Sequence, residues 1–279
     1  MTKIETVQSI YFSPTGTTKK ILTTIEANIT IQPVPQIDLT LPIQRDSFTG
    51  YVEGNLLLIG VPVYGGSPPW PMLEPLNKLK GEGRWAVPVA VYGNRSPDTC
   101  LVELAKILRN RGFKILAGAS FIAEHSIIAS NYQIASGRPD NKDMKIIADF
   151  GSKIKEKLIN KPSQIRFPEK LKNIITNEFV DSFPEDYHWR IIEPLNHLLK
   201  REFKEGDCIM CYICERVCPT AALKIESKEI NPSLCIWCAA CVRNCPMRVI
   251  SFRWADESSA SFQRRDKTFG PRKEPMIYI

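Results

Sequence analysis

The sequence predicts an α/β domain built on a five-stranded parallel sheet, followed by a small α+β module rich in cysteine. In the first 160 residues, short β-rich runs alternate with helical patterns, as they do in parallel sheets covered on both faces. Eight of the nine cysteines lie between Cys208 and Cys245, which sets the C-terminal region apart. The length of 279 residues corresponds to about two domains at roughly 150 residues each, and 43% hydrophobic residues can build a core in both.

The order of the expected elements follows from composition and periodicity. Five runs rich in β-branched and other apolar residues are expected to form the strands: residues 6–12, 36–41, 55–61, 85–91 and 114–123. Helical spacing of apolar residues indicates helices at residues 17–28, 72–80 and 98–111. A further helix is expected to begin near Asp140, which can cap its N-terminus, and to run to about residue 160.

The chain divides into four expected regions. Residues 1–160 form the α/β domain, and residues 161–204 form a linker and a helical strut. Prolines and the lack of a clear period indicate the linker at residues 161–183, and helical spacing indicates the strut at residues 184–203. Residues 205–255 form the cysteine-rich module, and residues 256–279 form a basic tail.

Composition places the protein in a broad class. The formal net charge is +7, 24% of residues are charged, and no apolar run approaches the roughly 18–20 residues of a membrane span. The first residues lack the pattern of a signal peptide, so we expect a cytoplasmic protein with reduced thiols rather than disulfides. We do not expect a nucleic-acid partner, because bound anionic cofactors would offset the positive charge. The tail is either a docking face for an acidic redox partner or simply solvated, and its basic residues are Arg264, Arg265, Lys267, Arg272 and Lys273.

The cysteine-rich module contains an internal repeat. The motif Cys-x2-Cys-x2-Cys-x3-Cys-Pro occurs twice, and the second copy begins 27 residues after the first. Three thiolates on such a tight turn can hold three corners of an iron–sulfur cubane, and the fourth ligand must come from elsewhere. In this the module resembles bacterial two-cluster ferredoxins, in which the fourth cysteine of each motif binds the other cluster.

The ferredoxin resemblance implies two [4Fe–4S] clusters with crossed ligands. One cluster would be held by Cys208, Cys211, Cys214 and Cys245. The other would be held by Cys218, Cys235, Cys238 and Cys241. Structural zinc is the alternative, but zinc ribbons use separated Cys-x2-Cys pairs without the third cysteine of this motif.

A loop rich in hydroxyl groups follows the first expected strand and opens the first expected helix. It contains Ser13, Thr15, Gly16, Thr17 and Thr18. N–H groups at a helix N-terminus attract an anion, hydroxyls donate to phosphate oxygens, and glycine lets the backbone approach closely. The loop therefore predicts a phosphate site, with ordinary helix capping by Ser and Thr as the alternative.

Two further loops follow the third and fourth expected strands. Their residues are Pro62, Val63, Tyr64, Gly65 and Gly66 in one loop, and Tyr92, Gly93 and Asn94 in the other. Ligands of open α/β sheets bind beyond the carboxyl ends of the strands, so the three loops are expected to converge on one crevice. Tyr64 and Tyr92 are candidates to flank a flat ring, the glycines can expose backbone to its polar edge, and Asn94 can serve as an amide partner.

The S-x-T-G-x-T loop, the strand-end loops and the order of elements resemble flavodoxin over about residues 1–160. The whole chain resembles the flavodoxin–ferredoxin fusions of the EFR-type ferrodoxin family. This resemblance implies a flavodoxin-like sheet, FMN at the strand-end loops, two [4Fe–4S] clusters and a role in electron transfer. Because exposed clusters are damaged by oxygen, we also expect an anaerobic or microaerobic host.

The leading interpretation is an iron–sulfur flavoprotein oxidoreductase. It would relay electrons between FMN and the clusters and exchange them with a ferredoxin-like redox protein or a small-molecule donor or acceptor. The alternatives are a pure electron carrier, an FMN-dependent reductase of a small substrate such as a quinone, and a non-enzymatic redox sensor. His125 is either a proton donor for the reductase or a structural residue, and Arg138 either binds an anionic substrate or begins a helix. Cys100 is expected in the core.

Overall fold

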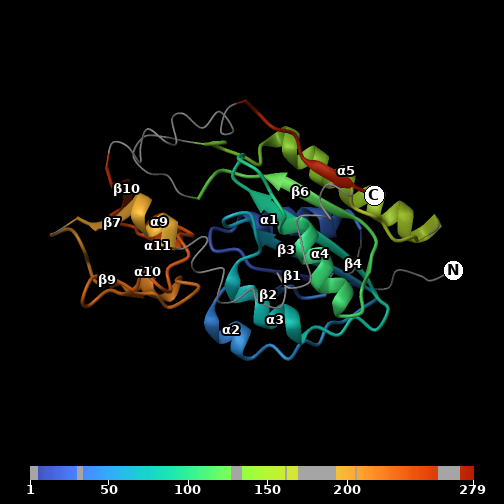
Figure 1. Cartoon of the computed structure of the whole chain (residues 1–279), viewed down its shortest axis with the longest axis horizontal. Coiled ribbons are helices and arrows are strands. Elements are labelled where there is room, and N and C mark those ends of the chain that lie inside the picture. Colours follow the sequence, from blue (N-terminus) through green and yellow to red (C-terminus); the bar gives the residue numbers. More distant parts are fainter. Residues whose placement is uncertain are drawn as a thin grey trace.

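A seven-stranded sheet forms the centre of the N-terminal domain (Figure 1). The structure is a computed structural model, and it describes residues 6–29, 34–126, 134–160, 162–168, 193–204, 206–256 and 271–279. Five strands are parallel to one another: β1 (Val7–Tyr11), β2 (Ile37–Asp38), β3 (Leu56–Pro62), β4 (Trp85–Tyr92) and β6 (Gly118–Ile122). Their spatial order, β2-β1-β3-β4-β6, is the 2-1-3-4-5 order of the flavodoxin-like fold. The predicted fold class is therefore confirmed.

The sheet has two more strands than the five predicted. The run at residues 114–123 is divided into β5 (Lys114–Ile115) and β6, because the two pieces pair with β4 in registers that differ by one residue. Pro88 lies between the part of β4 that pairs with β5 and the part that pairs with β6, and it has no N–H to donate to a neighbouring strand. The seventh strand, β11 (Met276–Tyr278), pairs antiparallel with β6 at the edge of the sheet.

Helices cover both faces of the sheet. α1 (Thr17–Ala27) and α5 (Asn141–Asn160) pack on one face, and α3 (Leu73–Lys78) and α4 (Cys100–Asn110) pack on the other. Successive side chains of β3 point to opposite faces of the sheet. Leu56 and Leu58 pack in the core with α1 and α5, and Leu57 and Ile59 pack in the core with α3 and α4. Two short helices, α2 (Pro42–Asp46) and η1 (Trp70–Met72), lie in the connections.

The cysteine-rich module packs beside the carboxyl ends of these strands (Figure 1). Its elements are α9 (Glu193–Leu198), β7 (Leu199–Phe203), α10 (Ile213–Arg216), β8 (Leu223–Lys224), β9 (Glu229–Ile230), α11 (Ala240–Asn244) and β10 (Ile250–Trp254). β7 pairs antiparallel with β10, and β8 pairs with β9. The predicted strut is therefore wrong at residues 199–203, where pairing with β10 favours a strand over the helix that local spacing indicated.

Two segments outside the predicted domain also contact the sheet. Ile165 and Phe167, at the start of the predicted linker, are buried, and the Ile165 N–H donates to the Ile115 carbonyl at 3.0 Å. Residues 271–279 of the predicted tail are exposed or half-buried, but they are not a separate tail, because β11 returns to the edge of the sheet. Arg264, Arg265 and Lys267, and the rest of the predicted linker and strut at residues 169–192, lie outside the described residues.

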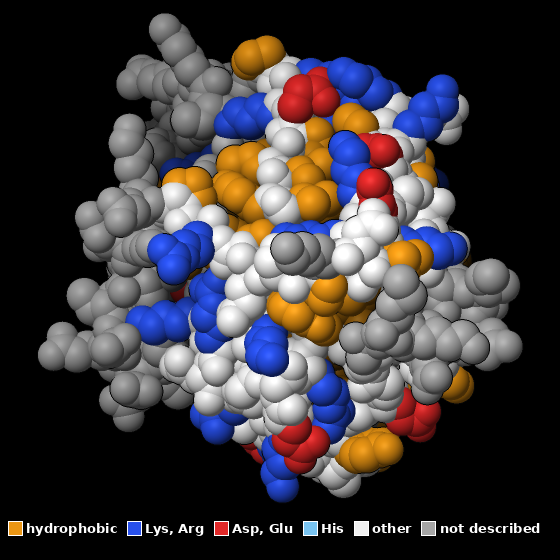
Figure 2. All heavy atoms as spheres, turned by 90° about the vertical axis from the view of Figure 1, so that its right-hand side faces the viewer, with side chains coloured by type: hydrophobic (Ala, Val, Ile, Leu, Met, Phe, Trp, Pro, Cys, Tyr) orange, Lys and Arg blue, Asp and Glu red, His pale blue; other side chains and the backbone are white. Residues whose placement is uncertain are grey.

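Charges of both signs lie on the end of the α/β domain away from the cysteine-rich module. On that face Lys and Arg side chains lie among Asp and Glu side chains and apolar patches (Figure 2). Within the described residues, no helix combines the length and the apolar character that crossing a bilayer requires.

Candidate functional site

A cavity of about 450 Å³ lies at the carboxyl ends of β1, β3, β4 and β6. We call it the strand-end cavity. The predicted residues that line it are Thr15, Thr17, Thr18, Pro62, Val63, Tyr64, Gly65, Gly66, Tyr92 and Gly93. Ser13, Gly16 and Asn94, which were also predicted to bind the cofactor, do not line it. The structure thus brings the three predicted loops together around one space.

The loop before α1 forms one end of this cavity. Gly16 is the N-cap of α1 with φ 81°, a left-handed conformation that favours glycine. The Ser13 hydroxyl accepts a hydrogen bond from the Lys19 N–H at 3.1 Å, so its role is to hold the loop. The first turn of α1 has no acidic side chain, and the threonines of the loop line the cavity. A helix N-terminus with these hydroxyls can bind a phosphate.

The loop after β3 is a tight turn at the other end of the cavity. Tyr64 and Ser67 exchange backbone hydrogen bonds of 3.1 and 3.2 Å, with Gly65 and Gly66 in left-handed conformations between them. A Cβ atom on Gly66 would lie 2.9 Å from Asp98 Oδ2, so a larger residue would displace that carboxylate. Burial raises the pKa of Tyr92, and its hydroxyl therefore stays a hydrogen-bond donor at ordinary pH.

His125 and Glu124 line the strand-end cavity just after β6. A Cβ atom on Gly93 would lie 2.4 Å from His125 Cδ2, which shows that the imidazole packs directly on the Gly93 backbone. His125 is therefore positioned by the loop that was predicted to contact a ring. By contrast, Cys100 is fully buried in α4, as expected of a core residue.

The cysteine-rich module supplies a second, apolar wall of the strand-end cavity. Its contributing residues are Leu195, Leu198, Leu199, Ile236, Trp237 and Trp254. The sequence analysis did not identify this wall. The apolar spacing around Leu195 was visible, but it indicated only a strut, and no local signal shows which face of another domain a helix will cover.

The eight motif cysteines fall into two groups of four. Cys208, Cys211, Cys214 and Cys245 line one small cavity, which we call the first cysteine cavity. Cys218, Cys235, Cys238 and Cys241 line another, the second cysteine cavity. Each group combines three cysteines of one motif with the last cysteine of the other, the arrangement that crossed ligation requires. Among the described residues, no three His, Cys, Asp or Glu side chains form a group suited to a single metal ion.

The backbone repeats with the same 27-residue period as the sequence. Left-handed conformations occur at equivalent positions in the two motifs, at Met210 and Trp237, at Tyr212 and Ala239, and at Ala221 and Arg248. Such residues beside right-handed ones turn successive N–H groups toward one point, which forms an anion-binding concavity of the kind found at iron–sulfur sites.

The two cysteine cavities differ in their exposure. Ile209 and Met247, which line the first cavity, are 60% and 44% exposed. In the second cavity, burial raises the pKa of Cys238 well above its ordinary value and that of Cys241 to about 12. Because metal ligands are thiolates, buried sulfurs like these need a strongly bound cation to offset the loss of hydration.

The second cysteine cavity lies against the α/β domain. Cys238 and Ala240 join the apolar core formed with α3 and α4. Arg243 Nη2 donates to Glu124 Oε1 at 2.8 Å and to the His125 carbonyl at 3.2 Å. Arg45 Nη2 donates to the Pro219 carbonyl at 2.6 Å. These contacts hold one cysteine cavity beside the strand-end cavity.

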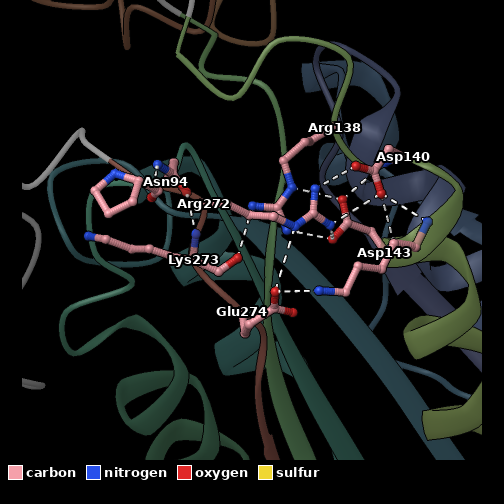
Figure 3. A network of polar contacts seen from close by, with 9 residues as sticks. Asn94, Arg138, Asp140, Asp143, Arg272, Lys273 and Glu274 are labelled. Atoms are coloured by element: carbon pink, nitrogen blue, oxygen red, sulfur yellow. Dashed lines mark hydrogen bonds and ion pairs between the residues drawn. The ribbon is translucent and has the colours of Figure 1, made fainter.

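Arg138 is a structural residue rather than a site for an anionic substrate. It is buried, and its Nε and Nη2 atoms donate to the Asp143 carboxylate at 2.8 and 2.5 Å (Figure 3). Arg272 of the C-terminal segment donates to Asp143 as well, at 3.0 Å, and to Asp140 at 2.6 Å. The carboxylates already occupy the donors that a substrate would need.

The C-terminal segment also holds the loop after β4. Asn94 accepts a hydrogen bond from the Lys273 N–H and donates one to the Pro271 carbonyl, both at 3.4 Å (Figure 3). Lys273 Nζ in turn donates to the Arg95 carbonyl. The predicted ring partner Asn94 thus contacts the C-terminal segment, and Lys273, which was expected in the basic tail, supports a loop of the cavity.

Comparisons with known proteins find one family match and several similar solved structures. Residues 202–224 match the family of 4Fe–4S binding domains. The chain is similar to a flavodoxin from the domain Archaea, with 18% identity and a TM-score of 0.41 over 56% of this chain and 99% of that chain. It is also similar to Fusobacterium nucleatum flavodoxin bound to flavin mononucleotide, with 19% identity and a TM-score of 0.38 over 55% and 98% of the two chains. For oxidised flavodoxin 2 from Bacillus cereus the values are 15% identity, a TM-score of 0.42, and 55% and 99%. No curated protein matches the chain.

The strand order defines the N-terminal domain, and the family match together with the repeated cysteine motif defines the C-terminal module. The chain therefore joins a domain with the flavodoxin-like strand order to a module in which residues 202–224 match the 4Fe–4S binding domains.

Proposed function

We propose that the chain transfers electrons between FMN in the strand-end cavity and two [4Fe–4S] clusters in the two cysteine cavities. The observation that carries this proposal is the position of Ile236, which lines both the strand-end cavity and the second cysteine cavity. The proposed FMN site and the proposed site of the second cluster are thus separated in space by the side chain of a single residue. Transfer within the chain then replaces a diffusional encounter between separate redox proteins.

The residues of the strand-end cavity fit FMN. Its volume lies within the range of about 300–1,000 Å³ that is usual for cofactor sites. Thr15, Thr17 and Thr18 would bind the phosphate at the N-terminus of α1, while Tyr64 and Tyr92 would lie near the ring. The apolar wall from the cysteine-rich module would exclude water from the ring.

The residues of the cysteine cavities fit iron–sulfur cubanes. Each cavity offers four sulfurs, and the left-handed residues of both motifs direct N–H groups toward an anionic centre. Each cluster carries one electron at a time, whereas FMN accepts one or two, so two clusters can supply the two electrons of a fully reduced flavin.

Exposure of the two cavities suggests the order of transfer. The first cysteine cavity has exposed apolar side chains at its edge, and the second is enclosed between the module and the α/β domain. An external redox protein or small molecule would therefore exchange electrons with the first cluster. The second cluster would pass them between the first cluster and FMN.

Anoxic purification followed by metal, sulfide and flavin analysis tests the cofactor content. We expect about eight iron atoms and about eight sulfides for each FMN. In stopped-flow experiments with photoreduced clusters, oxidised flavin absorbance should then decay at a rate independent of protein concentration. Zinc in place of iron, or a rate proportional to protein concentration, would contradict the proposal.

A reductase of a small substrate is the second candidate, because His125 and Glu124 line the strand-end cavity where they could meet a substrate. In this case a His125→Ala variant should lose turnover with a quinone acceptor while the transfer from clusters to FMN stays unchanged. Unchanged quinone turnover in the variant would leave only the relay.

A further inference from the structure

Arg201 of β7 lies beside the wall that the cysteine-rich module contributes to the strand-end cavity. Its guanidinium carbon is 3.7 Å from the centre of the Trp237 ring, and its Nη2 atom donates to Asn196 Oδ1 at 3.0 Å. Trp237 Nε1 donates to the same oxygen at 3.1 Å. These contacts fix the guanidinium in one position over the ring.

The Nε atom of Arg201 is buried and lacks a hydrogen-bond partner within the part of the chain that the structure describes. Arginine stays protonated in proteins, and a buried N–H without an acceptor is costly. Cys235 of the second cysteine cavity lies two residues before Trp237. Arg201 lies opposite Phe252 in the β7–β10 pair, and Phe252 lines the second cysteine cavity. A ligating sulfur at Cys235 would supply the acceptor that Arg201 lacks.

We propose that Arg201 raises the reduction potential of the cluster in the second cysteine cavity. The proposal rests on the proposed function, since it requires that cluster. Reduction adds one electron and therefore one negative charge, which burial disfavours. A fixed positive charge with an N–H that can donate to a ligand sulfur stabilises the reduced form more than the oxidised form.

The first motif has a different arrangement. Its Arg216 is exposed, and Nη2 donates to the Cys211 carbonyl at 2.8 Å, so water and salt screen its charge. Arg201 therefore separates the two potentials. The reduced first cluster would become oxidised by giving its electron to the second cluster, which has the higher potential and lies next to the FMN site.

Anoxic redox titration of the holoprotein, monitored by electron paramagnetic resonance, tests this role. In Arg201→Gln, which removes the charge and keeps a polar side chain, one cluster midpoint potential should become more negative while the other stays in place. Arg216→Gln is the matched control and should move neither. Iron and FMN contents are measured on every sample.

Unchanged midpoint potentials in fully loaded Arg201→Gln would overturn the proposal, and so would equal shifts of both clusters. If this variant loses iron, Arg201→Lys keeps the charge and should shift the same cluster in the same direction by less. No shift in a fully loaded lysine variant would also count against the role. Reduced wild-type clusters that fail to reduce FMN would contradict the proposed relay alone, because the cluster potentials are measured independently of that transfer.

Discussion

Arg272 and Asp140 form a two-bond ion pair between the C-terminal segment and the residue before α5, with N–O distances of 2.6 and 3.3 Å. The pair fastens the segment that continues into β11, the strand at the edge of the sheet. The flavodoxin-like domain is thus completed by residues that follow the cysteine-rich module in sequence. The chain leaves this domain, forms the module and returns, so the module is tethered at both ends.

Replacing Arg272 should weaken the attachment of the C-terminal segment to the α/β domain. We expect Arg272→Ala to lower the melting temperature of the holoprotein at pH 7, because it breaks the pair with Asp140 and the bond to Asp143. Hydrogen bonding from Arg272 is the main cause that lowers the pKa of Asp140 from its ordinary 3.8. A depressed carboxylate pKa contributes stability above the ordinary value and loses it as the pH falls further.

The difference in melting temperature between wild type and Arg272→Ala should therefore stay constant from pH 8 to about pH 5. It should shrink only below about pH 4. A difference that already fades between pH 7 and pH 5 would contradict this origin. Lys153→Ala, which breaks an exposed pair with Asp149 on α5, is the control and should change the melting temperature little.

Arg243 is expected to align the second cluster with FMN. Its ion pair with Glu124 is partly exposed, and such pairs contribute only about 0–1 kcal/mol to stability. Arg243→Ala should therefore barely change the melting temperature, yet slow the cluster-to-FMN transfer by up to about fivefold in stopped-flow measurements. Lys153→Ala breaks an exposed pair with Asp149 within α5 and should leave the rate intact. Equal rates in both variants would show that the apolar contacts alone hold the junction.

Local signals predicted the central strands and the strand-end loops, because each rests on a short run of sequence, whereas the grouping of the cysteines came from the resemblance to two-cluster ferredoxins. The buried run of β3 and the loop before α1 are examples. Strand β11 has only three residues, and its partner β6 lies more than 150 residues earlier, so periodicity could not reveal it. The apolar residues of β7 fit a helix equally well, and pairing with β10 decided the outcome. Asn94 was predicted to contact a ring, because no local sequence signal reveals its hydrogen bond with Lys273 of the C-terminal segment.

A substitution at Gly93 tests the strand-end cavity, and a second substitution should restore the FMN binding that the first one weakens. In Gly93→Ala the new Cβ atom would meet His125 at 2.4 Å, so the imidazole or the loop must shift. We expect weaker FMN binding in a flavin-release titration, with the cluster content unchanged. The double variant Gly93→Ala with His125→Gly removes all three His125 atoms that the new Cβ would meet and should recover much of the affinity. Failure of this rescue would show that the loss arises elsewhere in the loop.

Pairs of cysteine variants distinguish crossed from uncrossed ligation. If the ligands cross, Cys218→Ala and Cys235→Ala should abolish the same paramagnetic signal, and Cys208→Ala and Cys245→Ala the other. Each variant should retain about four iron atoms if the remaining cluster assembles. Cys100→Ala is the matched control, because Cys100 is buried in α4 away from both cysteine cavities and should keep both signals. If Cys218→Ala instead removed the same signal as Cys208→Ala, each motif would hold its own cluster, and the pairing of sulfurs across the two cavities would have to be abandoned.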